Sequence, residues 1–392
     1  MESKEMKKTM GAAVALSMVV GCVIGSGVFF KPQAIYTATG GAPGIGILSW
    51  IIGGLITLCA GLTVAEIAVV IPKTGGMMVY LEEVFGEKVG YLTGWMQCVL
   101  FYPGTAAALA VAFGNQLSEI LGHPGWAVGI AIVDIIVVII INEIGSKAAG
   151  LVQTLATIGK VIPLIFIAIF AFIKGSGTNP ILTPMVGPGL STGTVLGSVL
   201  IAILFAYEGW INVTPIVGEM KNPGKDLPKA FAGGILISVF GALNGFLLSG
   251  SRVAYTLGVQ KMIPGYKAFG KLNASDVPGN GVLLIGTLAC IYALTGQFNL
   301  LTDLATFTGW VFYVMTFIAV IILRKTKPDI ERVYKVPLYP IVPGIAIVGG
   351  GFVLINQLFM AGSGPRMVAL AGIGITLIGL PIYLIMTRKK AE

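Results

Sequence analysis

The chain has 392 residues, of which 56 % are hydrophobic and only 11 % are charged, and its formal net charge is +8. A mean hydropathy of +0.92 excludes a soluble globular protein and predicts an all-α, polytopic membrane protein embedded in a lipid bilayer. The excess positive charge is spread over short loops, where it indicates topology rather than nucleic-acid binding. We therefore expect a single transmembrane domain over residues 1–392.

Eleven apolar runs are long enough to cross a hydrocarbon core about 30 Å thick as helices. They lie near residues 11–39, 44–71, 89–119, 125–142, 147–173, 193–219, 233–258, 280–298, 301–323, 338–360 and 366–387. The connections between them are short, so no separate extramembrane domain is predicted.

The first run is interrupted by a glycine-rich stretch, Gly21-Cys22-Val23-Ile24-Gly25-Ser26-Gly27. Each glycine costs a helix about 1 kcal/mol relative to alanine, so this stretch predicts a broken helix. Backbone groups freed inside a bilayer must be covered by protein or solvated in a cavity, where they can bind a polar solute. The alternative is close helix packing, because Gly21 and Gly25 have the Gly-x-x-x-Gly spacing.

Lys160 lies inside the fifth run, 13 residues after Lys147 and 14 residues before Lys174. At 1.5 Å per residue it is about 20 Å from either end of the helix, too far for a lysine side chain to reach water. Its ammonium group is therefore expected to bind inside the protein. We interpret it as a fixed cation, and proton transfer or a structural tie between helix ends are the alternatives.

The sixth run contains a second irregular element, Phe205-Ala206-Tyr207-Glu208-Gly209-Trp210-Ile211-Asn212. A Glu-Gly pair between aromatic residues disfavours an ordinary lipid-facing helix. A carboxylate at membrane depth is costly, so Glu208 is a candidate functional residue. The alternative is that Glu208 braces the interrupted helix by accepting hydrogen bonds from loose backbone amides.

The distribution of lysine and arginine changes after the sixth run. Up to that point, basic loops alternate and place the N-terminus in the cytoplasm. Lys229 and Arg252 are then separated by only one span, although both lie in basic segments. The alternation returns, with a cytoplasmic C-terminus, only if one more crossing lies between them. We predict that a twelfth helix, the seventh in order, is missing near Phe231–Ala232, and that a chain without it forms a defective bundle that transports nothing.

Irregular first and sixth runs are typical of an inverted repeat of five helices plus five. We expect the first repeat at about 9–173, the second at about 191–323 and a C-terminal helix pair at about 337–387. In such a fold the two broken helices face each other at the middle of the membrane. Half-helix N-termini attract an anionic group and half-helix C-termini a cationic one, so the site suits a zwitterion.

Other polar residues in the runs carry less weight. Glu66, Asp134, Asn244 and Asp303 are not assigned a role. The sequence has no P-loop, no His/Cys cluster and no nucleophile–histidine pair in a folded region outside the membrane. We therefore predict no catalytic residue, no metal site and no cofactor, and the chain is not expected to be an enzyme.

Several motifs, spread in order over nearly the whole chain, resemble the amino acid–polyamine–organocation superfamily, most closely its L-type amino acid transporter branch and bacterial relatives. They are Val23-Ile24-Gly25-Ser26-Gly27-Val28-Phe29, Pro72-Lys73-Thr74-Gly75-Gly76, Gly94-Trp95, Phe205-Ala206-Tyr207-Glu208-Gly209-Trp210, Glu219-Met220-Lys221-Asn222-Pro223, Leu227-Pro228-Lys229-Ala230, Gly250-Ser251-Arg252 and Tyr334-Lys335-Val336-Pro337. The resemblance implies a LeuT-like fold of twelve helices and alternating access for amino acids, and it places the absent seventh helix after Lys229-Ala230-Phe231.

The resemblance also implies roles for individual residues. The substrate carboxylate would meet backbone N–H groups near Ser26 and Gly27, and the amino group would meet carbonyls near Val23, Ile24 and Phe205. Phe205 matches the gating aromatic residue, and Lys160 matches the lysine that replaces sodium in ion-independent members. The expected substrate site is Val23, Ile24, Gly25, Ser26, Gly27, Phe205, Ala206, Tyr207, Glu208 and Gly209.

We expect sodium-independent transport of small neutral L-amino acids by exchange in a bacterial plasma membrane. Glu208 stands where relatives often have Asp or Gly, so its effect on selectivity stays open. The alternatives are proton-coupled symport of amino acids, transport of cationic amino acids or polyamines, and a receptor or scaffold that transports nothing. The sequence does not indicate whether an accessory subunit is required.

Overall fold

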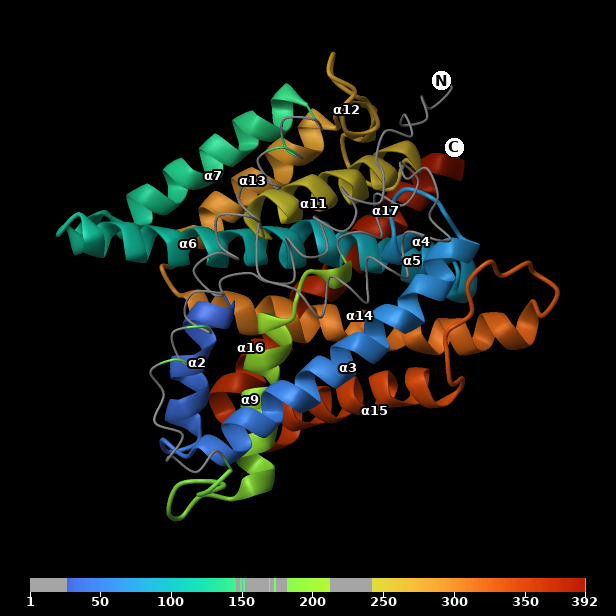
Figure 1. Ribbon diagram of the computed structural model, residues 1–392. Coiled ribbons are helices and arrows are strands. Elements are labelled where there is room, and N and C mark those ends of the chain that lie inside the picture. The colour runs from blue at the N-terminus through green and yellow to red at the C-terminus, as the bar shows by residue number, and fades with distance from the viewer. Residues whose placement is uncertain are drawn as a thin grey trace.

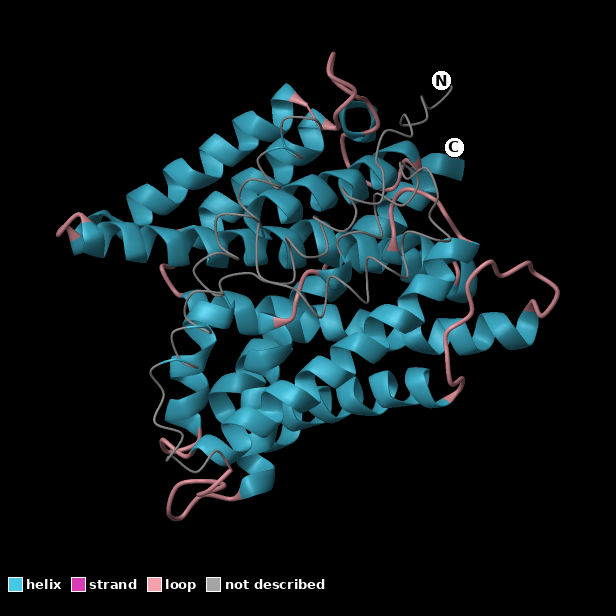
Figure 2. Ribbon diagram, in the orientation of Figure 1, coloured by secondary structure: helices cyan, strands magenta, loops and turns pink. Residues whose placement is uncertain are grey.

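The computed structural model describes residues 27–145, 182–211 and 242–391, together with the single positions Ala149, Leu151, Ile169 and Ile173. Within these residues every regular element is a helix, and there is no strand (Figures 1 and 2). The predictions for Val23, Ile24, Gly25, Ser26 and Lys160, and for the junction at Phe231–Ala232, fall outside the described residues.

The N-terminal half of the described chain contains α-helices, one π-helical turn and one 3-10 turn. They are α2 (Gly27–Ala38), α3 (Pro43–Val70), α4 (Met77–Phe85), α5 (Glu87–Met96), the π-helical turn η1 (Gln97–Phe101), α6 (Tyr102–Ile120), the 3-10 turn η2 (Pro124–Trp126), α7 (Ala127–Ile144) and α9 (Thr192–Ala206).

The C-terminal half contains the remaining helices of the described chain. They are α11 (Ala242–Val259), α12 (Tyr266–Phe269), α13 (Gly279–Ala293), α14 (Phe298–Thr326), α15 (Ile341–Ile355), the π-helical turn η4 (Asn356–Met360), α16 (Ser363–Leu377) and α17 (Gly379–Ala391).

Six helical stretches in the described part of the chain are long and apolar enough to cross a membrane. They are Pro43–Val70, Glu87–Ile120, Pro124–Ile144, Phe298–Thr326, Ile341–Met360 and Ser363–Arg388. Each coincides with a run predicted from the sequence. Two shorter apolar helices, Val195–Ala206 and Gly279–Ala293, lie in two further predicted runs.

α6 and α14 lie near the centre of the bundle (Figure 1). In the stretch Glu87–Ile120, 89 % of an apolar 18-residue segment is buried inside the protein. The corresponding share in Pro124–Ile144 is 22 %. α7 therefore presents most of its apolar surface outward, as expected of a helix that faces lipid. In the central packing, the buried ring of Trp210, which follows α9, contacts the rings of Tyr313 and Phe317 on α14.

α9 and α11 cross the bundle in the same direction as α3. The segment before α9 is bonded to the beginning of α3, because Gly44 N–H donates to the Pro184 carbonyl at 3.2 Å. The residue after α11, Gln260, instead donates to Glu82 of α4 at 2.8 Å, and α4 follows the end of α3. Thus α9 starts where α3 starts, and α11 ends where α3 ends.

Candidate substrate site

α9 ends at Ala206, inside the sixth apolar run, as the Glu-Gly pair predicts. Glu208 N–H still donates to the Phe205 carbonyl at 2.9 Å, but the next residue, Gly209, has φ of 113° and cannot continue a helix. Glycine adopts this left-handed backbone without the steric cost that a Cβ atom would add. The last carbonyls of α9 therefore lie at a helix C-terminus within the bundle, where the helix dipole is negative.

Gly27 of α2 packs directly against the end of α9. A Cβ atom built on Gly27 would lie 2.4 Å from the Ala206 Cα and 2.9 Å from its Cβ. Both residues are buried. Only glycine fits at position 27, so the structure brings together one residue from each of the two irregular runs.

Glu208 carries a buried carboxylate that has only one of its two oxygens bonded. Oε1 accepts hydrogen bonds from the Tyr313 hydroxyl at 2.8 Å and from Gly209 N–H at 3.1 Å. Oε2 has no hydrogen-bond partner among the described residues, and the side chain is only 3 % exposed. A buried carboxylate oxygen without a donor is costly, so this atom favours a proton or an ammonium group as its partner.

Aromatic packing holds Tyr313 in position beneath Glu208. The Tyr313 ring lies 5.2 Å from that of Trp210 and 5.6 Å from that of Trp310, measured between ring centroids. All three side chains are fully buried. The acceptor oxygen of Glu208 is therefore fixed toward α14, which agrees with the interpretation of Glu208 as a brace of the interrupted helix.

Tyr207 lies on the opposite side of this turn, against α3. Its hydroxyl donates to the Trp50 carbonyl at 3.3 Å, and its ring meets the Trp50 ring edge-on at 5.8 Å. A Cβ atom on Gly54 would lie 3.0 Å from the Tyr207 hydroxyl, so glycine makes room for this contact. Of the predicted site residues, Tyr207 contacts α3 and Glu208 contacts α14.

Phe205, the predicted gating residue, is buried at the end of α9 beside two residues from other helices. Its ring meets that of Phe298 edge-on at 5.7 Å. The Lys31 ammonium lies 5.2 Å from the centroid of each ring, within the range of a cation–π interaction. The same ammonium donates to Thr302 at 2.9 Å and to Asn299 at 3.1 Å, and pairs with Asp303 at 3.5 Å.

Lys31 and Asp303 have no function predicted from the sequence. The available signal was the position of Lys31 four residues after Gly27, which places both on one face of α2. The pairing of Lys31 with the beginning of α14 is a tertiary contact across 272 positions of sequence, and no local pattern predicts it.

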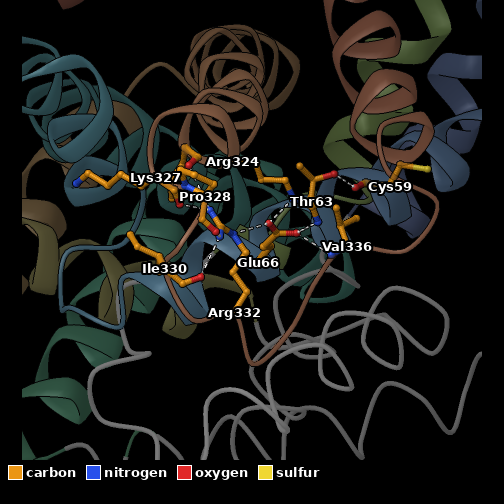
Figure 3. A network of polar contacts seen from close by, with 10 residues as sticks. Cys59, Thr63, Glu66, Arg324, Lys327, Pro328, Ile330, Arg332 and Val336 are labelled. Atoms are coloured by element: carbon orange, nitrogen blue, oxygen red, sulfur yellow. Dashed lines mark hydrogen bonds and ion pairs between the residues drawn. The ribbon is translucent and has the colours of Figure 1, made fainter.

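A second polar cluster lies at the other end of α3 and α14 (Figure 3). Glu66 is 2 % exposed, and its two oxygens accept hydrogen bonds from Arg324 Nε at 2.7 Å and Nη2 at 2.5 Å. Val336 N–H also donates to Glu66 at 2.7 Å, and Arg332 Nε lies 3.5 Å from it. Glu66, for which the sequence predicts no role, therefore holds the connection between α14 and α15 against the end of α3.

Arg332 forms hydrogen bonds within the same connection between α14 and α15. Its guanidinium donates to the carbonyls of Lys327, Pro328 and Ile330 at 2.9 to 3.0 Å. Burial, together with the nearby Glu66 carboxylate, raises the pKa of the Tyr334 hydroxyl to about 12. An exposed pair between Lys327 and Glu83, joined at 2.6 Å, lowers the pKa of Glu83.

No group of three His, Cys, Asp or Glu side chains in the described ranges is arranged to hold a metal ion. The site consists instead of helix ends, one buried carboxylate, one buried ammonium and aromatic rings. Such an arrangement can bind a charged or zwitterionic solute.

Comparison with protein families identifies a match over almost the whole chain. The family model described as amino acid permease matches residues 12–239 and 231–386. The match consists of two segments, which overlap at residues 231–239. This is the region where the charge pattern predicts a missing helix.

Curated relatives cover the full length of the chain. The serine/threonine exchanger SteT of Bacillus subtilis is 36 % identical over 100 % of this chain and 99 % of its own length. The b(0,+)-type amino acid transporter 1 of Mus musculus is 25 % identical over 100 % of this chain and 90 % of its own. The large neutral amino acids transporter small subunit 2 of Homo sapiens is 26 % identical over 96 % of this chain and 80 % of its own length.

The alignment with SteT is 447 positions long, whereas the chain has 392 residues, so about 55 of its positions have no residue here. The predicted resemblance to the superfamily and its L-type branch is confirmed, and the relatives are transporters rather than enzymes. The chain is a multi-pass membrane protein that belongs to the amino acid permease family.

Proposed function

We propose that the chain is built to exchange small neutral L-amino acids across a plasma membrane by alternating access, without sodium. The observation that carries this proposal is the contact between Gly27 and Ala206, which joins the two irregular runs inside the bundle. The name of SteT, a serine/threonine exchanger, supports both exchange and a small substrate. The family match supports amino acids as the substrate class.

The substrate would bind through the backbone. In this proposal its carboxylate meets N–H groups near Ser26 and Gly27, and its amino group meets carbonyls at the negative end of α9. The close packing at Gly27 leaves no room for a larger residue, which favours a compact site. Lys160 would supply the fixed positive charge that a coupled sodium ion supplies elsewhere.

The distribution of basic residues indicates which end of the bundle faces the cytoplasm. The end of the bundle at Glu66 also contains Arg324, Lys325, Lys327 and Lys335, so we place it in the cytoplasm. The end at Lys31 then faces outward. In this orientation, the inverted repeat of five helices plus five and the C-terminal pair at about 337–387 remain the proposed architecture.

The proposal is tested by counterflow of labelled amino acids into proteoliposomes. Exchange predicts uptake of labelled serine or alanine that requires unlabelled amino acid inside, needs no sodium and ignores a pH gradient. Uptake into empty liposomes driven by an acidic exterior would overturn exchange in favour of proton symport. Binding of a labelled amino acid without any flux, even after the missing span proposed below is restored, would favour a receptor.

A second candidate function is transport of a cationic amino acid or a polyamine. The specific observation in its favour is the Glu208 Oε2 atom, which has no donor among the described residues in an almost fully buried side chain. An ammonium group on the substrate could occupy that position. Counterflow of lysine, ornithine or putrescine that exceeds counterflow of serine would select this candidate.

We further propose that the chain lacks one transmembrane span between α9 and α11. Both helices run in the same direction, so a complete bundle needs a return crossing between them, where only 35 residues separate Ala206 from Ala242. The remainder of the sixth run ends before Glu219, charged residues follow up to Lys229, and the 12 residues after Lys229 would reach about 18 Å as a helix. A crossing requires about 20 residues, and the SteT alignment has about 55 positions without a residue here, which is enough for one.

Because of the missing span, we expect transport from a protein in which the span is restored but not from the 392-residue chain. A mass measurement of the intact chain tests whether the protein has the printed length. If it does, we expect no exchange from the chain itself and restored exchange after insertion of the SteT segment that aligns with the gap. Full exchange by the uninterrupted 392-residue chain would show that the span is not required.

A further inference from the structure

A groove of about 690 Å³ lies between α6 and α7, at the end of the bundle where these two helices meet. The helices are joined by the short connection 121–126 and diverge from it (Figure 1). The wall of the groove includes Phe113, Leu117, Trp126, Gly129, Val133 and Asp134. Phe113 is 49 % exposed, Trp126 57 % and Val133 60 %, so the groove is open to the surrounding bilayer.

Two glycines widen this groove. Gly125 and Gly129 both belong to its wall, and an added Cβ atom at either position would meet no atom within 4 Å. The close contact between α6 and α7 occurs elsewhere, at Gly114, where an added Cβ would collide with the Ala127 backbone. Among the described residues, Gly125 and Gly129 therefore do not serve helix packing, and they leave space that larger side chains would fill.

Asp134 places a carboxylate in the wall of the groove at the middle of the membrane. It lies 10 residues after Pro124 and 10 residues before Ile144, the bounds of the apolar stretch that contains α7. At 1.5 Å per residue it is about 15 Å from either end. A carboxylate at this depth is costly and is a functional-site candidate. Its two oxygens offer about four acceptor positions, so Asp134 can accept from an occupant of the groove as well as from the protein.

The extent of the groove favours a small molecule over a membrane-spanning helix. Its wall follows the chain from Gly125 to Val137, which is 12 residues or about 18 Å of helix. A helix that crosses the bilayer is about 30 Å long, and the groove ends near the middle of the membrane, just beyond Asp134. A phospholipid carries its charged headgroup at the membrane surface, far from this carboxylate. The volume lies within the range of about 300–1,000 Å³ that is typical of small-molecule sites.

We propose that this groove binds a lipophilic amine from the bilayer, with its ammonium group on the Asp134 carboxylate and its apolar body beside Phe113 and Trp126. The ammonium and the carboxylate form a pair without net charge, and their charge-assisted hydrogen bond is about twice as strong as a neutral one. The Trp126 ring, stacked on that of His123 with 4.5 Å between centroids, lies at the other end of the groove. This site is separate from the proposed transport function and does not depend on it.

The site is tested with para-bromophenylbutylamine in phosphatidylcholine proteoliposomes that contain the 392-residue chain. Trp126 precedes Asp134 by eight residues, about 12 Å of helix, which is close to the distance between nitrogen and bromine in this probe. Bromine quenches tryptophan fluorescence on contact, and the signal of Trp126 is the fluorescence that is lost in the Trp126→Phe protein. We expect the amine to quench this signal with saturation. para-Bromobutylbenzene, which has no ammonium group, should quench only in proportion to its concentration in the bilayer.

Asp134→Asn keeps the size of the side chain and removes the charge. We expect the amine to bind at least about tenfold more weakly, since one charge-assisted hydrogen bond carries about that factor. Gly129→Leu fills the groove and keeps the carboxylate, so saturable quenching should be lost. This variant should unfold at or above the temperature of the parent, because leucine is a better helix former than glycine, which separates a filled groove from loss of folding. The matched control is Gly374→Leu, an exposed glycine of α16 whose added Cβ also meets nothing, and it should bind the amine like the parent.

Three results would overturn the proposal. The first is quenching of Trp126 by the amine without saturation. The second is an unchanged affinity in either Asp134→Asn or Gly129→Leu. The third is cross-linking between two copies at Gly129→Cys, in a protein whose four native cysteines are alanine, that prevents quenching by the amine, because the groove would then belong to an interface between copies of the chain.

Discussion

Glu66 and Arg324 form a two-point ion pair across 258 positions of sequence, in which both carboxylate oxygens accept from the guanidinium. The pair ties the end of α3 to the end of α14. Because Glu66 also accepts from Val336 N–H, the same carboxylate fixes the connection that leads to α15. One side chain thus joins three segments at the basic end of the bundle.

Replacement of Glu66 by Gln should destabilise the protein strongly. The substitution leaves Arg324 without its carboxylate partner, and breaking a buried pair in this way costs about 3 kcal/mol or more. We expect a lower midpoint of thermal unfolding in detergent, measured by circular dichroism. Glu83→Gln, which breaks the exposed pair with Lys327, should cost less than about 1 kcal/mol. Equal effects of the two substitutions would contradict the interpretation of Glu66.

Replacement of Gly27 by Ala should abolish exchange, because the added Cβ meets the Ala206 backbone at 2.4 Å. The measurement is made in the protein with the inserted segment if the 392-residue chain is inactive. The reduction in counterflow should exceed about tenfold, since a displacement near 1 Å at a binding site can cost about a hundredfold. Gly193→Ala in α9 is the control, because a Cβ atom there meets nothing within 4 Å. Full counterflow by the Gly27→Ala protein would exclude Gly27 from the site.

Replacement of Lys160 by Ala should cripple transport if this lysine supplies the fixed charge of a sodium-independent transporter. Counterflow of labelled serine into proteoliposomes is the measurement, made in the protein with the inserted segment if the 392-residue chain is inactive. Lys267→Ala, an exposed lysine in α12, serves as the control and should leave the flux unchanged. Undiminished flux after Lys160→Ala would refute the proposed role.

Replacement of Glu208 by Gln should separate its two interpretations. If Glu208 only braces the turn, the amide keeps an acceptor for Tyr313 and neutral amino acids are exchanged nearly as before. If its Oε2 atom binds an ammonium group, counterflow of lysine or putrescine should fall by at least about tenfold while serine is spared. Tyr313→Phe, which removes the donor but keeps the carboxylate, is the matched control.

The sequence predicted the membrane-spanning runs and the end of the sixth helix because both are local properties. Hydropathy determines the runs, and the Glu-Gly pair after Tyr207 ends α9 where expected. Gly27 and Ala206 were expected to face each other because two broken helices in a five-plus-five repeat meet at the middle of the membrane. The five-plus-five repeat and the roles of the site residues stay predictions.

The ion pairs could not be predicted in the same way. Glu66 has no role assigned from the sequence, and its partner Arg324 belongs to a helix that follows much later in the chain. Lys31 lies eight residues before the end of the first apolar run, near enough to that end for a lysine side chain to extend toward water. Its burial depends on Asp303 and the two phenylalanine rings, which become neighbours only when α2, α9 and α14 pack together.

The common direction of α9 and α11 has a consequence for the two termini. α17 lies beside α5 near the start of the stretch Glu87–Ile120, because the Tyr383 ring is 5.2 Å from that of Tyr91, so the folded bundle leaves its C-terminus at the basic end. A chain with an odd number of crossings cannot have both termini on one side of a membrane. Epitope tags at the two ends should therefore report opposite compartments in the 392-residue chain, and the same compartment after the aligned SteT segment is inserted.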